Sequence, residues 1–308
     1  MSIRSVGKRL VEWALCEAGA PRLGALLRRR GTLVLAYHNI VPDAEAPCGD
    51  VTLHLSRKAF AQQLDHLQRT HEIVPIGRVF DGDVRPSARP CAAITFDDAY
   101  MGAVSEGVEE LVSRGVPGTI FAAPAWLGGN AFWWDEFADA ERGSLDRQLR
   151  RMALGALAGR QDLIHAWAAR EGRRPQVMPP FARTATEGDL QAASARPGIT
   201  VGSHSWSHPN LSGLDPNELR EEVTRPLDWL RARVPTTVPV LAYPYGFSTL
   251  SSRRAAAAAG YDAAFHLEGG WVASNQARSA RFALPRADIP SGLSLEGFRL
   301  RVSGLLRV

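Results

Sequence analysis

The chain has 308 residues, of which 45% are hydrophobic and 22% are charged, a globular composition that allows one large domain or two small ones. Its net charge of +4 is carried almost entirely by arginine, and no Lys/Arg block is dense enough to indicate nucleic-acid binding. The cysteines Cys16, Cys48 and Cys91 are odd in number and lack CxxC spacing, which argues against a disulfide framework or a cysteine-bound zinc site.

Signals for membrane insertion or export are not evident in the sequence. No run of about 18 apolar residues occurs, so we expect no membrane-spanning helix. Charged residues interrupt the first 30 residues, which therefore lack the apolar core of a signal peptide. We expect a cytoplasmic protein.

Residues 1–30 are expected to form an N-terminal amphipathic helical segment. Apolar residues recur at helical spacing over residues 3–28, and Pro21 is expected to break the run. Basic residues accompany them at positions 4, 8, 9, 28, 29 and 30. The segment can pack on the outside of the domain, which is the preferred interpretation, or lie on a membrane surface as a peripheral contact.

From residue 31 onward, apolar strands alternate with amphipathic helices, which predicts an α/β barrel over residues 31–308. A turn around Gly82, Pro86 and Pro90 precedes the third strand. The expected strands are residues 32–37, 73–76, 91–97, 117–123, 199–202, 238–243, 261–266 and 281–285. The expected helices are residues 56–70, 100–114, 185–195, 216–233, 249–259 and 292–306.

Residues from about 126 to 195 interrupt this alternation. The stretch begins with an aromatic cluster and continues through an arginine-rich helical region. Because strands and helices alternate again afterwards, we interpret it as an insertion between two core strands and not as a separate domain.

Two adjacent carboxylates end the most apolar strand. Small and apolar residues 91–96 lead directly into Asp97 and Asp98, a pattern typical of a strand buried on both faces. Burying an ionised carboxylate costs several kcal/mol unless a metal, a cation or hydrogen bonds compensate it. The pair therefore suggests a functional site at the carboxyl end of the strand. The alternative is that the pair caps a helix beginning near Tyr100.

Two histidines follow a later strand. His204 and His208 are four residues apart, so on a helical turn they would face the same way and share one metal ion. Two histidines and one carboxylate form a frequent catalytic zinc shell that leaves a position for water. The second carboxylate of the Asp97–Asp98 pair would then accept a proton from that water. The alternative is a pair of ordinary surface histidines.

In this order, Thr95-Phe96-Asp97-Asp98, His204-Ser205-Trp206-Ser207-His208 and Tyr243-Pro244-Tyr245-Gly246 resemble the motifs of the NodB-homology polysaccharide deacetylases, carbohydrate esterase family 4. The resemblance covers about residues 31–290. It implies a distorted (β/α)7-type barrel and metal-dependent removal of the N-acetyl group from an N-acetylhexosamine unit in a polysaccharide or glycan precursor. It also implies one divalent metal ion, with Zn²⁺ as the default for such a shell.

The resemblance assigns roles by position in the motifs. Asp97 corresponds to the general base, and Asp98, His204 and His208 correspond to the metal ligands. After Pro244, the backbone N–H of Tyr245 corresponds to a donor that stabilises the oxyanion. The alternative for the Pro244–Gly246 segment is a plain turn.

The sequence departs from the family pattern in two places, so other residues must take the roles of the missing ones. The arginine that usually stands two positions before the motif proline is Ala242 here, and Arg286 is our candidate to hold the base instead. The late Leu-x-His motif with the acid histidine is missing, and His266 is a poor match. We expect His38, at the end of the first strand, to be the general acid, as in the permuted poly-N-acetylglucosamine deacetylases of biofilm systems. Asp288 is suggested as its orienting partner.

Trp126, Trp133 and Trp134, together with Asp135, either line a sugar groove or pack the inserted region onto the barrel, and packing is preferred for at least one of the tryptophans. The remaining histidines are interpreted as ordinary surface or structural residues; these are His54, His71 and His165.

Two further functions stay open at this point. The same site could act on a cytoplasmic lipid-linked or nucleotide-linked sugar. Alternatively, the chain is a non-catalytic carbohydrate-binding barrel, an interpretation that rests on Ala242 and on the missing late histidine motif. The sequence leaves the oligomeric state undetermined.

Overall fold

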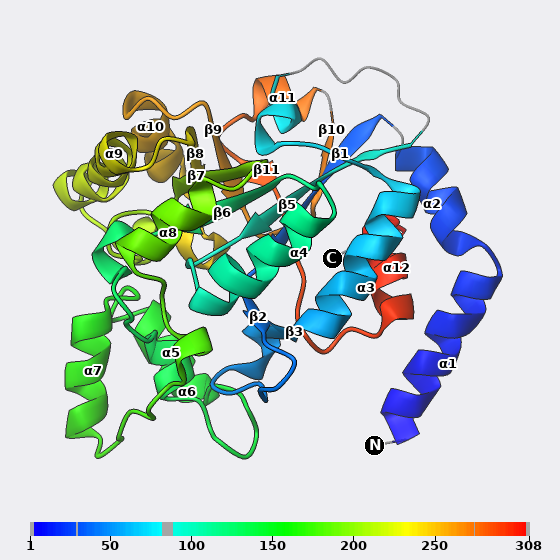
Figure 1. Ribbon diagram of the computed structural model, residues 1–308. Helices are drawn as coiled ribbons and strands as arrows, with labels where there is room; N and C mark the ends of the chain where they lie inside the picture. The colour runs from blue at the N-terminus through cyan, green and yellow to red at the C-terminus, as the bar shows by residue number, and fades with distance from the viewer. Residues whose placement is uncertain (1–2, 29, 82–88, 274, 306–308) are drawn as a thin grey trace.

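A barrel-like parallel sheet forms the centre of the molecule, and helices surround it (Figure 1). The computed structural model describes residues 3–28, 30–81, 89–273 and 275–305. Successive neighbours in the sheet are β1 (Gly31–Tyr37), β5 (Cys91–Phe96), β6 (Gly118–Ala122), β7 (Ile199–Ser203), β8 (Thr237–Ala242) and β9 (Ala263–His266).

Two very short strands on either side of one residue complete the ring. β11 (Leu284–Pro285) pairs in parallel with β9, and β12 (Ala287–Asp288) pairs in parallel with β1. Only Arg286 separates them, so this segment links the last strand of the ring to the first. The expected barrel is confirmed. Outside the ring, β10 (Trp271–Ala273) runs antiparallel to β1, and β4 (Glu72–Ile73) pairs with β5.

The strands form a two-sided core because successive side chains point to opposite faces. One apolar cluster includes Val34, Ala93, Phe121 and Phe265, which come from four strands of the ring. The alternate positions, such as Ile94, belong to the larger cluster shared with the surrounding helices. Burial on both faces explains why these strands read as continuous apolar runs.

The helices around the barrel begin and end close to the expected positions. They are α3 (Arg57–Thr70), α4 (Val108–Ser113), α8 (Glu187–Ser194), α9 (Pro216–Arg233), α10 (Leu250–Ala258) and α12 (Leu295–Val302). A π-helical turn, Ala103–Gly107, precedes α4. The expected strand 73–76 is shorter, because Ile76 begins a 3₁₀ turn. The expected turn at Gly82 and Pro86 lies outside the described residues.

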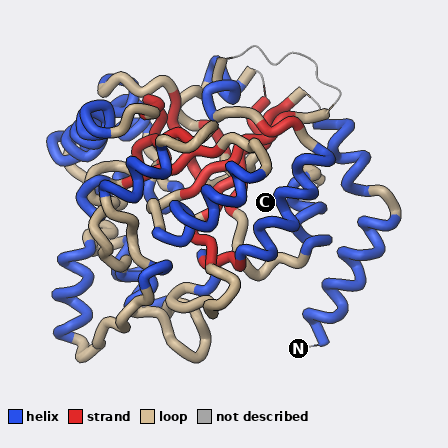
Figure 2. The backbone as a smooth tube through the Cα atoms, viewed as in Figure 1, coloured by secondary structure: helices blue, strands red, loops and turns tan. Residues whose placement is uncertain are grey.

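The inserted region between β6 and β7 contains α5 (Trp133–Glu136), α6 (Arg147–Leu154) and α7 (Gln161–Arg170) as well as α8. The backbone tube shows the strands gathered in the middle, with these three helices grouped beside one end of them (Figure 2). A separate two-stranded sheet, β2 (Asn39–Val41) with β3 (His54–Ser56), lies near the same end. Side chains of the inserted helices share the main core cluster, so this region packs directly on the barrel.

Two helices, α1 (Ile3–Glu17) and α2 (Ala20–Arg28), form the N-terminal edge beside α12 (Figure 1). The break between them comes at Gly19, which has a φ of 79°, and not at Pro21 as expected. Pro21 lies in the first turn of α2, where a proline removes no intrahelical hydrogen bond. Among the described helices, none is both long and apolar enough to cross a membrane.

Candidate active site

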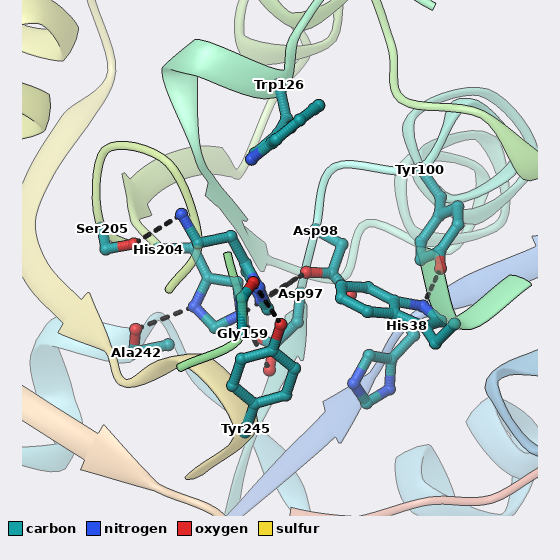
Figure 3. Close-up of polar contacts among 12 residues, drawn as sticks. His38, Asp97, Asp98, Tyr100, Trp126, Gly159, His204, Ser205, Ala242 and Tyr245 are labelled. Carbon is teal, nitrogen blue, oxygen red and sulfur yellow. Dashed lines mark hydrogen bonds and ion pairs between the residues drawn. The ribbon is translucent and has the colours of Figure 1, made fainter. Parts of the chain in front are cut away.

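The three motif segments follow β5, β7 and β8, so they meet at the carboxyl end of the barrel. Figure 3 shows Asp97, Asp98, His204 and Tyr245 converging, with His38 at the end of β1 beside them. These side chains line a cavity of about 230 Å³. The cavity wall also includes Trp133 and Trp134 from the inserted region and Asp50, Arg150, Phe247, Leu267 and Asp288.

Backbone strain is concentrated in these segments. Six described non-glycine residues have positive φ angles. Four of them lie in the three motif segments, namely Asp98, Ser205, His208 and Tyr245, and a fifth, Ala99, directly follows the first segment. A left-handed conformation costs about 1–2 kcal/mol for a residue with a side chain, so the surrounding contacts must hold it. Such strain is typical of functional sites.

The two histidines converge through a strained loop and not through the helical turn expected from their spacing. The His208 N–H donates to Ser205 Oγ at 3.0 Å. The N–H groups of Trp206 and Ser207 both donate to Glu222 Oε2 of α9 at 2.9 Å. Glu222 thus holds the loop in place. Sequence reasoning missed it because one carboxylate within a polar helix carries no recognisable signal.

The carboxylate of Asp97 is held by a buried guanidinium. Arg286 Nη1 donates to Asp97 Oδ1 at 2.6 Å and Nη2 donates to Oδ2 at 2.8 Å. Nη1 also donates to Thr95 Oγ1 at 3.1 Å. Burial favours the neutral acid, but Arg286 and His204 outweigh it and hold the pKa of Asp97 below its usual range. Asp97 is therefore ionised at neutral pH with both oxygens fixed in direction.

Asp98 forms a cluster with the two histidines. Its Oδ1 lies 3.1 Å from His208 Nε2 and 3.6 Å from His204 Nε2. One ligand atom from each of the three residues lies within 4.8 Å of the others, and all three residues are buried. Asp98 thus faces imidazoles and does not cap the following helix, as the alternative would require.

The ligand atoms that these three residues offer fit a divalent cation. Within the described part of the chain, no hydrogen bond reaches Asp98 Oδ1 or His208 Nδ1, although both atoms are buried. His204 Nδ1–H donates to the Ala242 carbonyl at 2.8 Å, which leaves Nε2 with its lone pair toward Asp98. Burial lowers the pKa of His204 to about 4, although Asp97 raises it in part. Neutral imidazole nitrogens and a carboxylate oxygen are the ligands that Zn²⁺ takes in catalytic sites.

The other predicted catalytic residue, His38, lies on the opposite side of the cavity from the β7 loop (Figure 3). Its side chain is 12% exposed. His38 Nδ1 lies 4.0 Å from Asp288 Oδ1, which is an ion-pair distance but too long for a hydrogen bond. His266, in contrast, accepts a hydrogen bond from Glu268 N–H and is not part of the cavity wall.

Tyr245 is the second residue of the Pro244–Gly246 turn and closes the cavity beside His208. The centres of the Tyr245 and His208 rings are 4.7 Å apart. The Tyr245 hydroxyl accepts from Trp133 Nε1 at 3.2 Å and donates to the Gly159 carbonyl at 3.3 Å. A Cβ on Gly159 would lie 2.7 Å from the Tyr245 ring, so this approach requires glycine.

The tryptophans of the inserted region are mainly packing residues. Trp133 and Trp134 are 1% and 6% exposed, so each contributes little accessible surface to the cavity. Trp134 stacks on Phe132 with ring centres 4.3 Å apart, and its Nε1 donates to the Tyr100 hydroxyl. Trp126 Nε1 donates to the Ser207 carbonyl at 2.6 Å, which joins the inserted region to the histidine loop.

A second buried His–carboxylate cluster is centred on Asp135. Asp135 was expected to line a sugar groove, but it is fully buried and does not belong to the cavity wall. Asp135 Oδ1 accepts from His54 Nε2 at 2.9 Å and from Asp50 N–H at 3.0 Å. Asp135 Oδ2 accepts from the Tyr100 hydroxyl at 2.6 Å. His54 Nδ1 pairs with Asn39 Nδ2 at 2.9 Å. His54 is thus a fully buried structural residue and not a surface one.

The family model for polysaccharide deacetylases matches residues 85–264, which is more than half of the chain. The chain belongs to the polysaccharide deacetylase family. This deacetylase is accordingly a hydrolase that acts on amide bonds, and the resemblance seen in its motifs is confirmed. A sequence comparison with curated proteins gives no significant match.

Solved structures show that this deacetylase shares its fold with bacterial deacetylases. The deacetylase PplD of Streptococcus pyogenes matches with a TM-score of 0.59 and 16% identity over 87% of this chain and 96% of that one. IcaB from Ammonifex degensii matches with a TM-score of 0.59 and 17% identity over 90% and 98%. The de-N-acetylase from Aggregatibacter actinomycetemcomitans matches with a TM-score of 0.61 and 14% identity over 88% and 99%.

Proposed function

We propose that this chain is a metal-dependent deacetylase that hydrolyses the N-acetyl group of an N-acetylhexosamine unit in a polysaccharide or glycan precursor. The observation that carries the proposal is the buried Asp98–His204–His208 cluster, in which Asp98 Oδ1 faces two imidazole nitrogens but has no hydrogen bond among the described residues, next to an ionised Asp97 in one cavity. A structural cluster would have its polar atoms satisfied by hydrogen bonds.

Asp98, His204 and His208 would hold one divalent cation, with Zn²⁺ favoured by two imidazoles and one carboxylate. When bound, such an ion supplies Lewis-acid polarisation of the amide carbonyl and lowers the pKa of water. His204 is prepared for this role because its Nδ1–H bond to Ala242 fixes the ring and its tautomer.

The other residues act on protons and on charge. Asp97 accepts the proton of the attacking water, and Arg286 keeps its two oxygens oriented while the charge changes. The backbone N–H of Tyr245, in the first turn of a 3₁₀ segment where amides lack intrahelical partners, stabilises the oxyanion. His38 protonates the departing amine nitrogen from the β1 side of the cavity.

The cavity suits a small part of a sugar chain. Its volume of about 230 Å³ fits one acetylated sugar unit better than a long buried segment. The carboxylates of Asp50 and Asp288 and the guanidinium of Arg150 line it and offer hydrogen-bond partners for sugar hydroxyls. A second candidate keeps this site but uses a lipid-linked or nucleotide-linked sugar. The exposed apolar side chains of α1 and α2 favour a lipid carrier.

Acetate release from N-acetylglucosamine oligomers tests the proposal. We expect release by the metal-loaded protein, loss after treatment with a chelator, and recovery when zinc is added back. Apo-protein that stays folded by circular dichroism serves as the control. If the folded, metal-loaded protein releases acetate from no N-acetylated sugar, free or carrier-linked, the proposed activity is wrong and the alternative of a non-catalytic carbohydrate-binding barrel is favoured.

A further inference from the structure

The N-terminal helices face the protein with their polar and small residues. On α1, Glu12 is buried and accepts a hydrogen bond from Ser294 Oγ, and Cys16 Sγ donates to the Glu296 carbonyl. On α2, the buried residue is Gly24, where a Cβ would lie 2.4 Å from the Ser303 carbonyl oxygen. A helix that covers a domain normally does so with its apolar stripe, so this arrangement is reversed.

The apolar side chains of α1 and α2 point away from the barrel. We call these exposed residues the outer face. They are Leu10, Val11, Trp13, Leu15, Leu23, Leu26 and Leu27. Leu10 is 62% exposed and Leu27 is 70% exposed. Leu305, which is also exposed, lies next to Gly24 of α2. The remaining large apolar residues that are exposed in the described chain belong to other segments: Leu163, Val177, Phe247 and Leu250. A concentration of this kind marks an interaction surface.

Positive charge accompanies the outer face. Lys8, Arg9, Arg22 and Arg28 are exposed on the two helices, while Glu12 is turned inward and leaves Glu17 as the exposed carboxylate of this helix pair. A second copy of the chain docked through the same face would bring these like charges together. An anionic surface would instead be attracted to them.

A basic cavity of about 670 Å³ adjoins the outer face. Arg22 and Leu26 of α2 form part of its wall, and Arg69, Arg299 and His71 line its inner side. Glu17 is the carboxylate in that wall. Burial and the neighbouring guanidinium of Arg299 lower the pKa of His66, another wall residue, to about 4. At neutral pH the positive charge of the cavity therefore comes from its arginines, which include Arg22, Arg69 and Arg299, and these lie where phosphate groups of lipid headgroups would meet them.

We propose that α1 and α2 seat the protein on an anionic lipid bilayer, with the outer face in the boundary between headgroups and acyl chains. Leucines with a tryptophan on one side of a basic helix are suited to this boundary, because the apolar side chains enter it while the cations meet lipid phosphates. The surface lies outside the catalytic cavity, so this inference does not rest on the proposed function.

Flotation with lipid vesicles tests the inference. The protein should float with vesicles that contain about one third phosphatidylglycerol and should stay unbound with phosphatidylcholine alone. The double variant Leu23→Glu/Leu27→Glu should lower the partition coefficient at least about tenfold. The matched control Leu163→Glu/Val177→Glu makes the same chemical change at exposed positions away from α1 and α2 and should bind as the wild type does.

The charges are tested separately. Arg22→Gln/Arg28→Gln should lower binding about fivefold for each charge removed, whereas Arg170→Gln/Arg220→Gln, at exposed positions on other helices, should have little effect. The inference would be overturned if the Leu23→Glu/Leu27→Glu variant bound anionic vesicles as well as the wild type does, or if the wild type did not bind them. A dimer in sedimentation that this variant dissociates, without vesicle binding, would also overturn it and assign the outer face to a second copy.

Discussion

Two buried His–carboxylate clusters in this molecule differ in how their polar atoms are satisfied. In the Asp135 cluster, both carboxylate oxygens accept hydrogen bonds and both nitrogens of His54 have partners. In the Asp98 cluster, Asp98 Oδ1 and His208 Nδ1 have no hydrogen-bond partner among the described residues. Both clusters are buried, so burial alone does not distinguish a structural site from a functional one.

This contrast separates a buried carboxylate that the protein neutralises itself from one that can accept a bound cation. The Asp135 cluster lies in the core, where the protein supplies a donor to each carboxylate oxygen and a partner to each nitrogen of His54. Asn39 Oδ1, at the edge of this cluster, has no hydrogen bond among the described residues. The Asp98 cluster opens into the cavity beside Asp97, which Arg286 already satisfies. The remaining negative charge at Asp98 is therefore available for a cation, and variants at the two clusters should have opposite consequences.

The largest effect is expected at Asp98. Asp98→Asn removes the only carboxylate of the metal cluster, so bound zinc should fall well below one equivalent. Acetate release should drop on the order of 10³-fold or more, because several kcal/mol of charge stabilisation is lost. Metal analysis after dialysis and an acetate assay measure both. Unchanged zinc content in a folded Asp98→Asn protein would contradict the ligand assignment.

The next largest effect is expected at His38. His38→Ala should keep its zinc and lose about 10²–10⁴-fold in turnover, because the departing amine would have no proton donor. The matched control His165→Ala removes a partly exposed histidine that pairs with Glu136 in the inserted region, and it should leave turnover unchanged. Full activity in His38→Ala would transfer the acid role to another residue.

Arg286→Met should reduce stability as well as activity, and the loss should depend on pH. Removing the cation leaves a buried carboxylate unpaired, at a cost of about 3–5 kcal/mol in the free energy of unfolding. Arg286 holds the pKa of Asp97 below its unfolded value of about 3.9, so the pair stabilises the fold above about pH 4 and this contribution is lost as the pH falls through the folded pKa.

Denaturant unfolding of the apo-proteins at neutral and acidic pH measures this difference. The difference in the free energy of unfolding between wild type and Arg286→Met should be large at neutral pH and should become smaller in acid, where Asp97 becomes protonated in the variant. Arg286→Lys, which keeps the charge but not the two-pronged contact, should fall between them. If the difference in the free energy of unfolding does not depend on pH, lost packing, and not the ion pair, explains the destabilisation.

The smallest effect on activity is expected in the Asp135 cluster. Asp135→Asn should lower the free energy of unfolding by about 1–3 kcal/mol, because its hydrogen bonds with His54 and Tyr100 are weakened. Its zinc content should match that of the wild type. If Asp135→Asn loses zinc as Asp98→Asn does, the distinction between the two clusters fails.

The barrel could be predicted from the sequence, and so could the set of residues that gather at its carboxyl end. Continuous apolar runs identify strands buried on both faces, and their carboxyl ends share one mouth in a parallel barrel. Polar residues that directly follow such strands are therefore brought together even when they are far apart in the chain. This is why the Asp97–Asp98 pair, the His204–His208 pair and Tyr245 could be assembled from three short motifs.

Other features could not be predicted from the sequence, because they depend on contacts between residues far apart in the chain or on which side of a helix is covered. Glu222 anchors the histidine loop and His54 completes the Asp135 cluster, yet neither belongs to a local pattern. The two-residue strands on either side of Arg286 are too short to produce a periodic signal. Helical spacing showed that α1 and α2 are amphipathic. It did not show that their apolar side faces outward. The periodicity shows that a helix has an apolar side and a polar side, but only packing determines which of the two contacts the barrel.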